Sequence, residues 1–337
     1  GGDAGQKPAI PITSIRNGKI TTVFKQQEYA LEEINGTFSH DFFSLRSRLM
    51  GAPLQIFARQ IGQHWTGQIR LEDAAVNELS PDLSGDVSIR IGFQEYSDHI
   101  GLRTHINART IQLPGGGTPF ENLSLTFKCS VADELIRLTD LEFQAADFFF
   151  SGSAQLTGPF HNQAHGNTPL MLTVTSQPLA YEKMVAHLPA HDLPDWAGPL
   201  LLEQIGGGSV QIQKLTFQGV LSDLIDGEAF FKDLSIDALL SDMSYGTGYG
   251  PERVTGISGN LKIIDGDLRI HGLTGTTDHA KLQCVDLIFP DLMAPDLRTI
   301  VNANLDMPAE EFQYLWHAAM EPRVVYDLLE PLSRITN

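Results

Sequence analysis

The sequence predicts an all-β protein with minor helix, in which a long, curled antiparallel sheet is built of meander repeats. Apolar and polar residues alternate with a period of two along most of the chain, which is typical of half-buried strands. Turn-forming residues separate these runs at short intervals, and the 31 glycines and 18 prolines are spread along the chain. One apolar face and one polar face on successive hairpins indicate an antiparallel sheet.

The clearest strand is residues 123–131, in which every odd position is apolar and every even position is polar. Residues 210–213 and 215–218 alternate with a slip between them, which predicts a bulge at Lys214. We expect strands of about seven residues each. Further alternating runs lie at residues 19–24, 54–59, 85–91, 102–113, 171–174, 234–238, 268–271, 282–289 and 301–307.

Two kinds of segment interrupt these strands. Three dipeptides predict two-residue hairpin turns, namely Asn17-Gly18, Asn35-Gly36 and Asp265-Gly266. Helix is expected at residues 179–188, 195–205, 309–320 and 323–335, where capping residues, glycines or prolines mark the ends. The chain is therefore expected to comprise strands in residues 1–178, a helical interruption in 179–208, strands in 209–307 and a helical cap in 308–337.

An internal repeat links the two strand-rich halves. Residues 125–156 align with residues 257–289 at an offset of about 132 positions, and each copy is a three-stranded meander. A weaker copy begins at Ile34, where Ile-Asn-Gly-Thr-Phe matches Ile-Ser-Gly-Asn-Leu from Ile257. The matching apolar positions are Ile136, Leu138 and Leu141 with Leu268, Ile270 and Leu273.

The second copy reads Ile257-x-Gly259-x-Leu261, then Asp265-Gly266-x-Leu268-x-Ile270-x-x-Leu273-x-Gly275. This pattern resembles the repeat of the AsmA-like family, the bacterial envelope proteins related to AsmA, TamB and YhdP. The resemblance implies a periplasmic protein anchored to the inner membrane, with an apolar groove that carries phospholipid towards the outer membrane. It implies no catalytic residues and no cofactor.

The formal net charge of −18 limits the partners that the sequence supports. A nucleic-acid binder needs basic residues to neutralise phosphates, so nucleic acid is excluded as an expected partner. No run approaches the roughly 18 apolar residues that span a bilayer. The chain also begins without an export signal, so we expect the membrane anchor in a segment absent from this sequence.

Motifs for metal binding and catalysis are weak. Two histidine pairs have the spacing of metal ligands on a helix, namely His161 with His165 and His187 with His191. The residues around both pairs are typical of loops, and neither pair has a third ligand at a suitable spacing. Cys129 and Cys284 predict either two separate strand cysteines or one disulfide. We expect no metal, no cofactor and no enzymatic activity, although the carboxylate pair of a glycosidase would leave no local motif.

The leading hypothesis is therefore a lipid-handling segment whose alternating apolar residues contact acyl chains of phospholipid or a related lipid. The alternative is a structural or assembly module that binds other envelope proteins. The sequence leaves open whether the apolar face forms a trough or a sandwich closed by its own side chains. The candidate lining residues are Leu123, Leu125, Phe127, Val210, Ile212, Phe217, Leu261, Ile263, Leu268 and Ile270.

Overall fold

The computed structural model describes residues 13–24, 27–49, 51–78, 84–112, 118–158, 168–187, 204–225, 227–246, 253–277, 281–292 and 300–306. The predicted fold class is confirmed, since these residues form one antiparallel sheet of 19 strands that does not close, with little helix. The chain divides into unit 1 (Gly1–Gln177 and Thr216–Phe230) and unit 2 (Pro178–Leu215 and Phe231–Asn337). None of the described helices is both long and apolar enough to cross a membrane.

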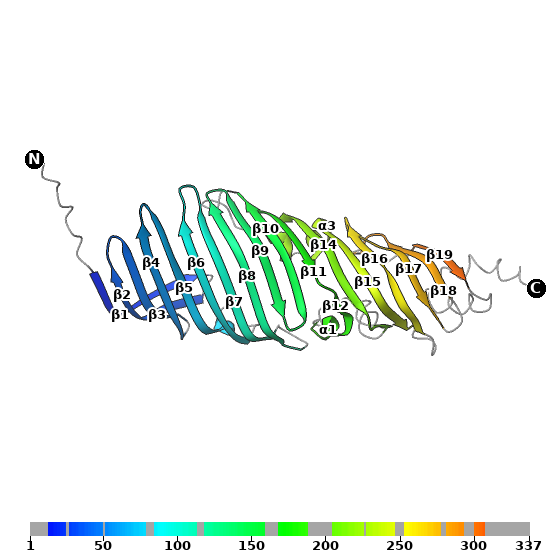
Figure 1. Cartoon of the computed structure of the whole chain (residues 1–337), viewed down its shortest axis with the longest axis horizontal. Coiled ribbons are helices and arrows are strands. Elements are labelled where there is room, and N and C mark those ends of the chain that lie inside the picture. The colour runs from blue at the N-terminus through cyan, green and yellow to red at the C-terminus, as the bar shows by residue number, and fades with distance from the viewer. Residues whose placement is uncertain are drawn as a thin grey trace, which may run out of the picture. The chain divides into compact units, whose positions relative to one another are not determined.

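Unit 1 is a meander in which each strand from β1 to β11 pairs with the next along the chain. Figure 1 shows β4 to β10 side by side in chain order. The elements are β1 (Thr13–Phe24), β2 (Gln27–Phe38), β3 (Phe42–Leu49), β4 (Ala52–Ile61), β5 (His64–Ala75), η1 (Val76–Glu78), β6 (Ser84–Glu95), β7 (Ile100–Gln112), β8 (Phe120–Ala132), β9 (Leu135–Ala145), β10 (Phe148–Thr157) and β11 (Pro169–Ser176).

The second half of the chain continues the same pattern, and β15 to β19 pair in order. Strand β14 and helix α3 each run across the boundary between the units. The elements are β12 (Leu179–Ala180), α1 (Tyr181–Ala186), β13 (Ile205–Gly206), β14 (Ser209–Val220), η5 (Leu221–Ile225), α3 (Gly227–Asp233), β15 (Leu234–Gly246), β16 (Arg253–Ile264), β17 (Asp267–Thr276), β18 (Lys281–Phe289) and β19 (Ile300–Asp306).

The helix predictions have mixed outcomes. The helix expected at residues 179–188 is α1, although its first two residues belong to β12. The helix expected at 195–205 lies outside the described residues except at its end, where Ile205 is in a strand. Both helices of the predicted cap lie outside the described residues. Helix α3 and the 3-10 turn η5 were not predicted, because the pattern around them is too short to distinguish from strand.

Two of the three predicted hairpin turns are wrong. Asp265-Gly266 does join β16 to β17, and both residues have positive φ. Asn17-Gly18 and Asn35-Gly36 instead lie inside β1 and β2. Asn17 has a φ of 52°, and its backbone N–H donates to Oδ1 of Asn35 at 3.2 Å. The first dipeptide forms a bulge within a strand because Asn, like Gly, tolerates positive φ both in turns and in bulges.

The same kind of bulge recurs in both units. Each bulge has a residue with positive φ, a register shift and then a residue on the apolar side of the sheet. A side chain on the next strand often accepts the N–H of the bulge residue, as Ser88 does for Asp73 and Asp286 for Gly272. The bulge residues are Asn17, Glu33, Asp73, Asp140, Asp242, Gly256 and Gly272. With such a bulge at Asp242, strand β15 reaches 13 residues, longer than the predicted seven.

The pairing register confirms the internal repeat. Thr126 pairs with Glu142 and Lys128 with Thr139, with a shift between them. At the same offset of 132 positions, Ser258 pairs with Thr274 and Asn260 with His271, again with a shift between them. The two three-stranded meanders β8–β10 and β16–β18 therefore share their pairing as well as their apolar pattern.

Candidate functional site

The register places one continuous apolar layer on one side of unit 1. In β8, Leu123, Leu125 and Phe127 point to the same side, because alternate residues of a strand share a face. Leu125 lies opposite Ile106 of β7 and Phe143 of β9, and directly opposed residues also share a face. The pairing of β9 with β10 and of β10 with β11 places further residues of these strands on the same face. The large members of the layer in β7–β11 include Leu102, Ile106, Leu123, Leu125, Phe127, Leu138, Leu141, Phe143, Phe148, Phe150, Leu156, Leu170, Leu172 and Val174.

Most of these large side chains are half-buried, whereas Phe148 and Leu170 are buried. The fully buried members of the same layer include small residues, such as Ala108, Ala145 and Ala154. Two sheets packed face to face about 10 Å apart would bury their inner side chains. The layer is therefore covered around Leu170, where Leu138, Leu156 and Leu172 pack against a buried cluster that contains Phe217. The half-buried side chains away from this cluster pack against each other and leave their outer ends accessible.

Phe217 has a different environment from the other predicted lining residues. Its side chain is 0% exposed and packs with Ala154 and Leu170 in one apolar cluster. The ring of Phe230 in α3 stacks on it with centroids 5.6 Å apart. In this structure Phe217 is thus covered by α3, and it offers no surface to a ligand.

Four predicted lining residues form one patch in unit 2. Leu261 of β16 lies opposite Ile270 of β17, and Ile263 lies opposite Leu268. All four are half-buried. The patch extends to β18, because Leu268 and Ile270 lie opposite Phe289 and Leu287.

Val210 and Ile212 lie on one face of β14, and both are half-buried. Val210 pairs with Leu179 of β12. Gln213 and Lys214, which follow, are both exposed, so the burial pattern is interrupted where the sequence predicted a bulge.

The opposite face of unit 1 is polar. In β8 it carries the exposed Lys128 and the half-buried Ser124, Thr126 and Ser130. Across β3 to β7 it carries arginines, including Arg46, Arg70, Arg90 and Arg103. This basic surface is not apparent from the sequence, because the arginines lie on different strands and only the strand pairing brings them together.

Few ionisable groups have an altered pKa, and those groups are scattered. Burial raises the pKa of Tyr181 to about 12 and raises the pKa of the Cys129 thiol. A hydrogen bond with His99 holds the pKa of Asp98 below its ordinary value, in an exposed turn. These shifts follow from burial and turn geometry, and no two of these groups lie together in one site.

The predicted weak motifs are separated or lie outside the described residues. Cys129 and Cys284 are free thiols, one buried and one exposed. His161, His165 and His191 lie outside the described residues, and His187 caps the end of α1. Within the described ranges, no three His, Cys, Asp or Glu side chains are grouped so that they could hold a metal ion.

Comparison with protein-family models, with curated proteins and with solved structures found no match.

Proposed function

We propose that this chain is a periplasmic segment of an AsmA-like envelope protein that holds or conducts phospholipid between the inner and outer membranes. The observation that carries the proposal is the apolar layer of β7–β11, most of whose large side chains stay half-buried. Each acyl methylene that leaves water on such a layer contributes about 0.8 kcal/mol. The lipid headgroup would remain in water at the edge of the layer.

Two further features support the proposal. The register makes the layer continuous from strand to strand, so an acyl chain can stay in contact with it while crossing several strands. The patch around Leu261 and Ile270 in unit 2 has the same character. The Ile257–Gly275 pattern that resembles the AsmA-like repeat runs through this second patch.

The test is photo-crosslinking from single positions along β8 in cells, followed by mass spectrometry of the adducts. A crosslinking amino acid placed at Leu123, Leu125 or Phe127 should capture phospholipid, because these positions face the apolar layer. The same residue at Ser124 or Thr126 is the matched control, since these neighbours on the same strand face the opposite side. The expected result is lipid capture with a period of two residues.

Equal capture from odd and even positions would contradict the proposal, because it would show that the face of the strand does not matter. Capture of a protein from the odd positions, with no lipid, would instead favour an assembly module that binds other envelope proteins. Native mass spectrometry of the purified protein gives a second readout, in which phospholipid adducts are expected.

A further inference from the structure

The exposed face of β3–β7 in unit 1 carries an ordered row of basic side chains. Arg46 lies opposite Gln55, and Gln55 lies opposite Arg70. Arg70 lies opposite Arg90, which in turn lies opposite His105. We call these five residues the basic row. At about 4.8 Å per strand, Arg46 and Arg70 are about 10 Å apart along the row.

The basic row has little internal compensation. Like charges directly opposite each other in a sheet are unfavourable, and Arg70 and Arg90 have this arrangement. Glu72 lies 3.9 Å from Arg70, at the outer limit of an ion pair. Arg46 and Arg90 are exposed, and neither makes an ion pair with a described carboxylate within 4.0 Å. The row therefore presents several positive charges that an anion would stabilise.

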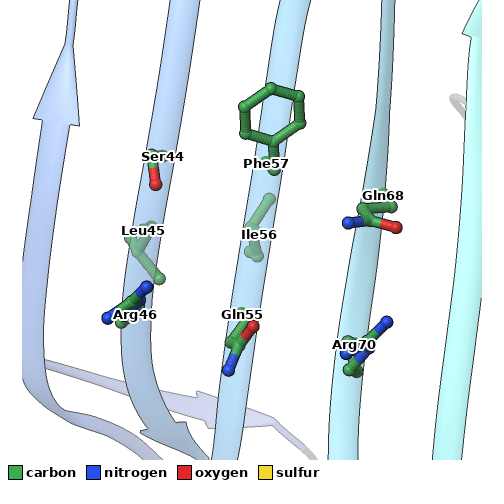
Figure 2. Close-up of a pocket in the computed structure, with 8 residues that line it drawn as sticks. All are labelled: Ser44, Leu45, Arg46, Gln55, Ile56, Phe57, Gln68 and Arg70. Atoms are coloured by element: carbon green, nitrogen blue, oxygen red, sulfur yellow. The ribbon is translucent and has the colours of Figure 1, made fainter.

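One end of the basic row borders a pocket of about 190 Å³. Figure 2 shows Arg46, Gln55 and Arg70 at one level on three neighbouring strands, with Phe57 and Gln68 above them. Ser44 completes the polar lining, and Leu45, Ile56 and Phe57 are the apolar residues that border the pocket. All the polar lining residues offer N–H or O–H donors, and no carboxylate lines the pocket.

We propose that the basic row is a binding site for a small ligand with more than one phosphate group. A guanidinium group binds phosphate oxygens through two parallel hydrogen bonds, and Gln55 and Gln68 add neutral donors. The spacing of the arginines favours two or more phosphates over one. The net charge of −18 opposes a long polyanion, whereas a small ligand responds mainly to charges within the Debye length of about 8 Å.

This inference is independent of the proposed lipid function, because it concerns the opposite face of the sheet. The test is calorimetric titration of the whole chain with inorganic tripolyphosphate at about 50 mM salt, where screening is weak. The double variant Arg46→Gln/Arg70→Gln should bind about tenfold or more weakly, because it loses both guanidinium groups that border the pocket. Arg253→Gln is the matched control, since it removes one exposed arginine from unit 2 and should change the affinity less than about twofold.

A second arm distinguishes a soluble ligand from a lipid headgroup. Vesicles of neutral phospholipid, with and without an anionic phospholipid, are sedimented with the protein. If the protein sediments only with vesicles that contain the anionic lipid, and the double variant does not, the phosphate belongs to a lipid headgroup. If the protein binds tripolyphosphate but does not sediment with vesicles, the ligand is soluble. The proposal is overturned if the unmodified protein binds neither probe, or if the double variant and Arg253→Gln bind equally well. Circular dichroism of each variant verifies that the sheet is intact.

Discussion

Phe217 shows that an apolar residue at an alternating strand position can be buried inside the fold and not exposed at its surface. It has the alternation of its neighbours in β14, yet its side chain is completely buried beneath Phe230. Leu125 also occupies an alternating apolar position, in β8, and is only half-buried. Phe217 is buried because α3, which follows β14 and η5 in the chain, places Phe230 over it. Phe217 is therefore expected to stabilise the fold and not to contact a ligand.

Replacement of Phe217 by Ala should reduce the free energy of unfolding by about 3 to 5 kcal/mol, as expected for a large cavity in an apolar cluster. Urea denaturation followed by circular dichroism measures this change. Phe57→Ala is the control, because Phe57 is 37% exposed and its removal should cost less than about 1.5 kcal/mol. A loss at Phe217 no larger than at Phe57 would show that α3 does not cover the cluster in solution.

The bulges explain why the strands are longer than their alternating segments. At each bulge the alternation slips by one residue, and the next apolar side chain returns to the same side. Asp73 and Gly272 illustrate the requirement, since each has a positive φ and an N–H that bonds to a side chain 14 or 15 residues further along. Asp, Asn and Gly are the residues that adopt this backbone conformation most readily.

Gly272 allows the bulge geometry to be tested. Its φ is 62°, and a Cβ there would meet no other atom within 4 Å. Gly272→Ala should therefore reduce the stability by about 1 kcal/mol through backbone strain alone. Gly272→Asn should reduce it less, because Asn tolerates positive φ and Asp140 occupies the equivalent bulge of the other repeat.

The matched control is Gly92→Ala in β6. Gly92 is not among the positive-φ residues, and an added Cβ would lie 4.0 Å from its nearest neighbour, so no loss of stability is expected. Thermal unfolding of the three variants measures the effect. Equal stability of the Ala and Asn variants at position 272 would mean that the backbone there does not keep the positive φ.

Within unit 1, the two faces of one sheet have opposite chemistry. The layer that contains Leu125 is apolar and mostly half-buried, whereas the basic row on the other face is exposed apart from the half-buried Arg70. An apolar surface of this kind usually marks an interaction site. Lipid and phosphate would therefore occupy different faces and should not compete.

The purified protein, once stripped of lipid by detergent exchange, should bind the neutral dye Nile red and increase its fluorescence. Added phospholipid should displace the dye, because both bind the apolar layer. Inorganic tripolyphosphate should leave the fluorescence unchanged. Failure of the stripped protein to bind dye would indicate that the layer is covered in solution, and displacement by tripolyphosphate would indicate that the two faces are not independent.

The sequence alone determined the fold class, the repeat and the apolar membership of the sheet. This was possible because the period of two can be read within each short segment of sequence. The two copies of the repeat also keep the same strand pairing at an offset of 132 residues. Its predictions for Asn17-Gly18 and Asn35-Gly36 were wrong because a turn and a bulge can use the same residues. The burial of Phe217 and the alignment of Arg46, Arg70 and Arg90 depended on the tertiary structure. Each requires segments that are distant in the chain to meet, and only the strand register and the return of α3 decide which segments do so.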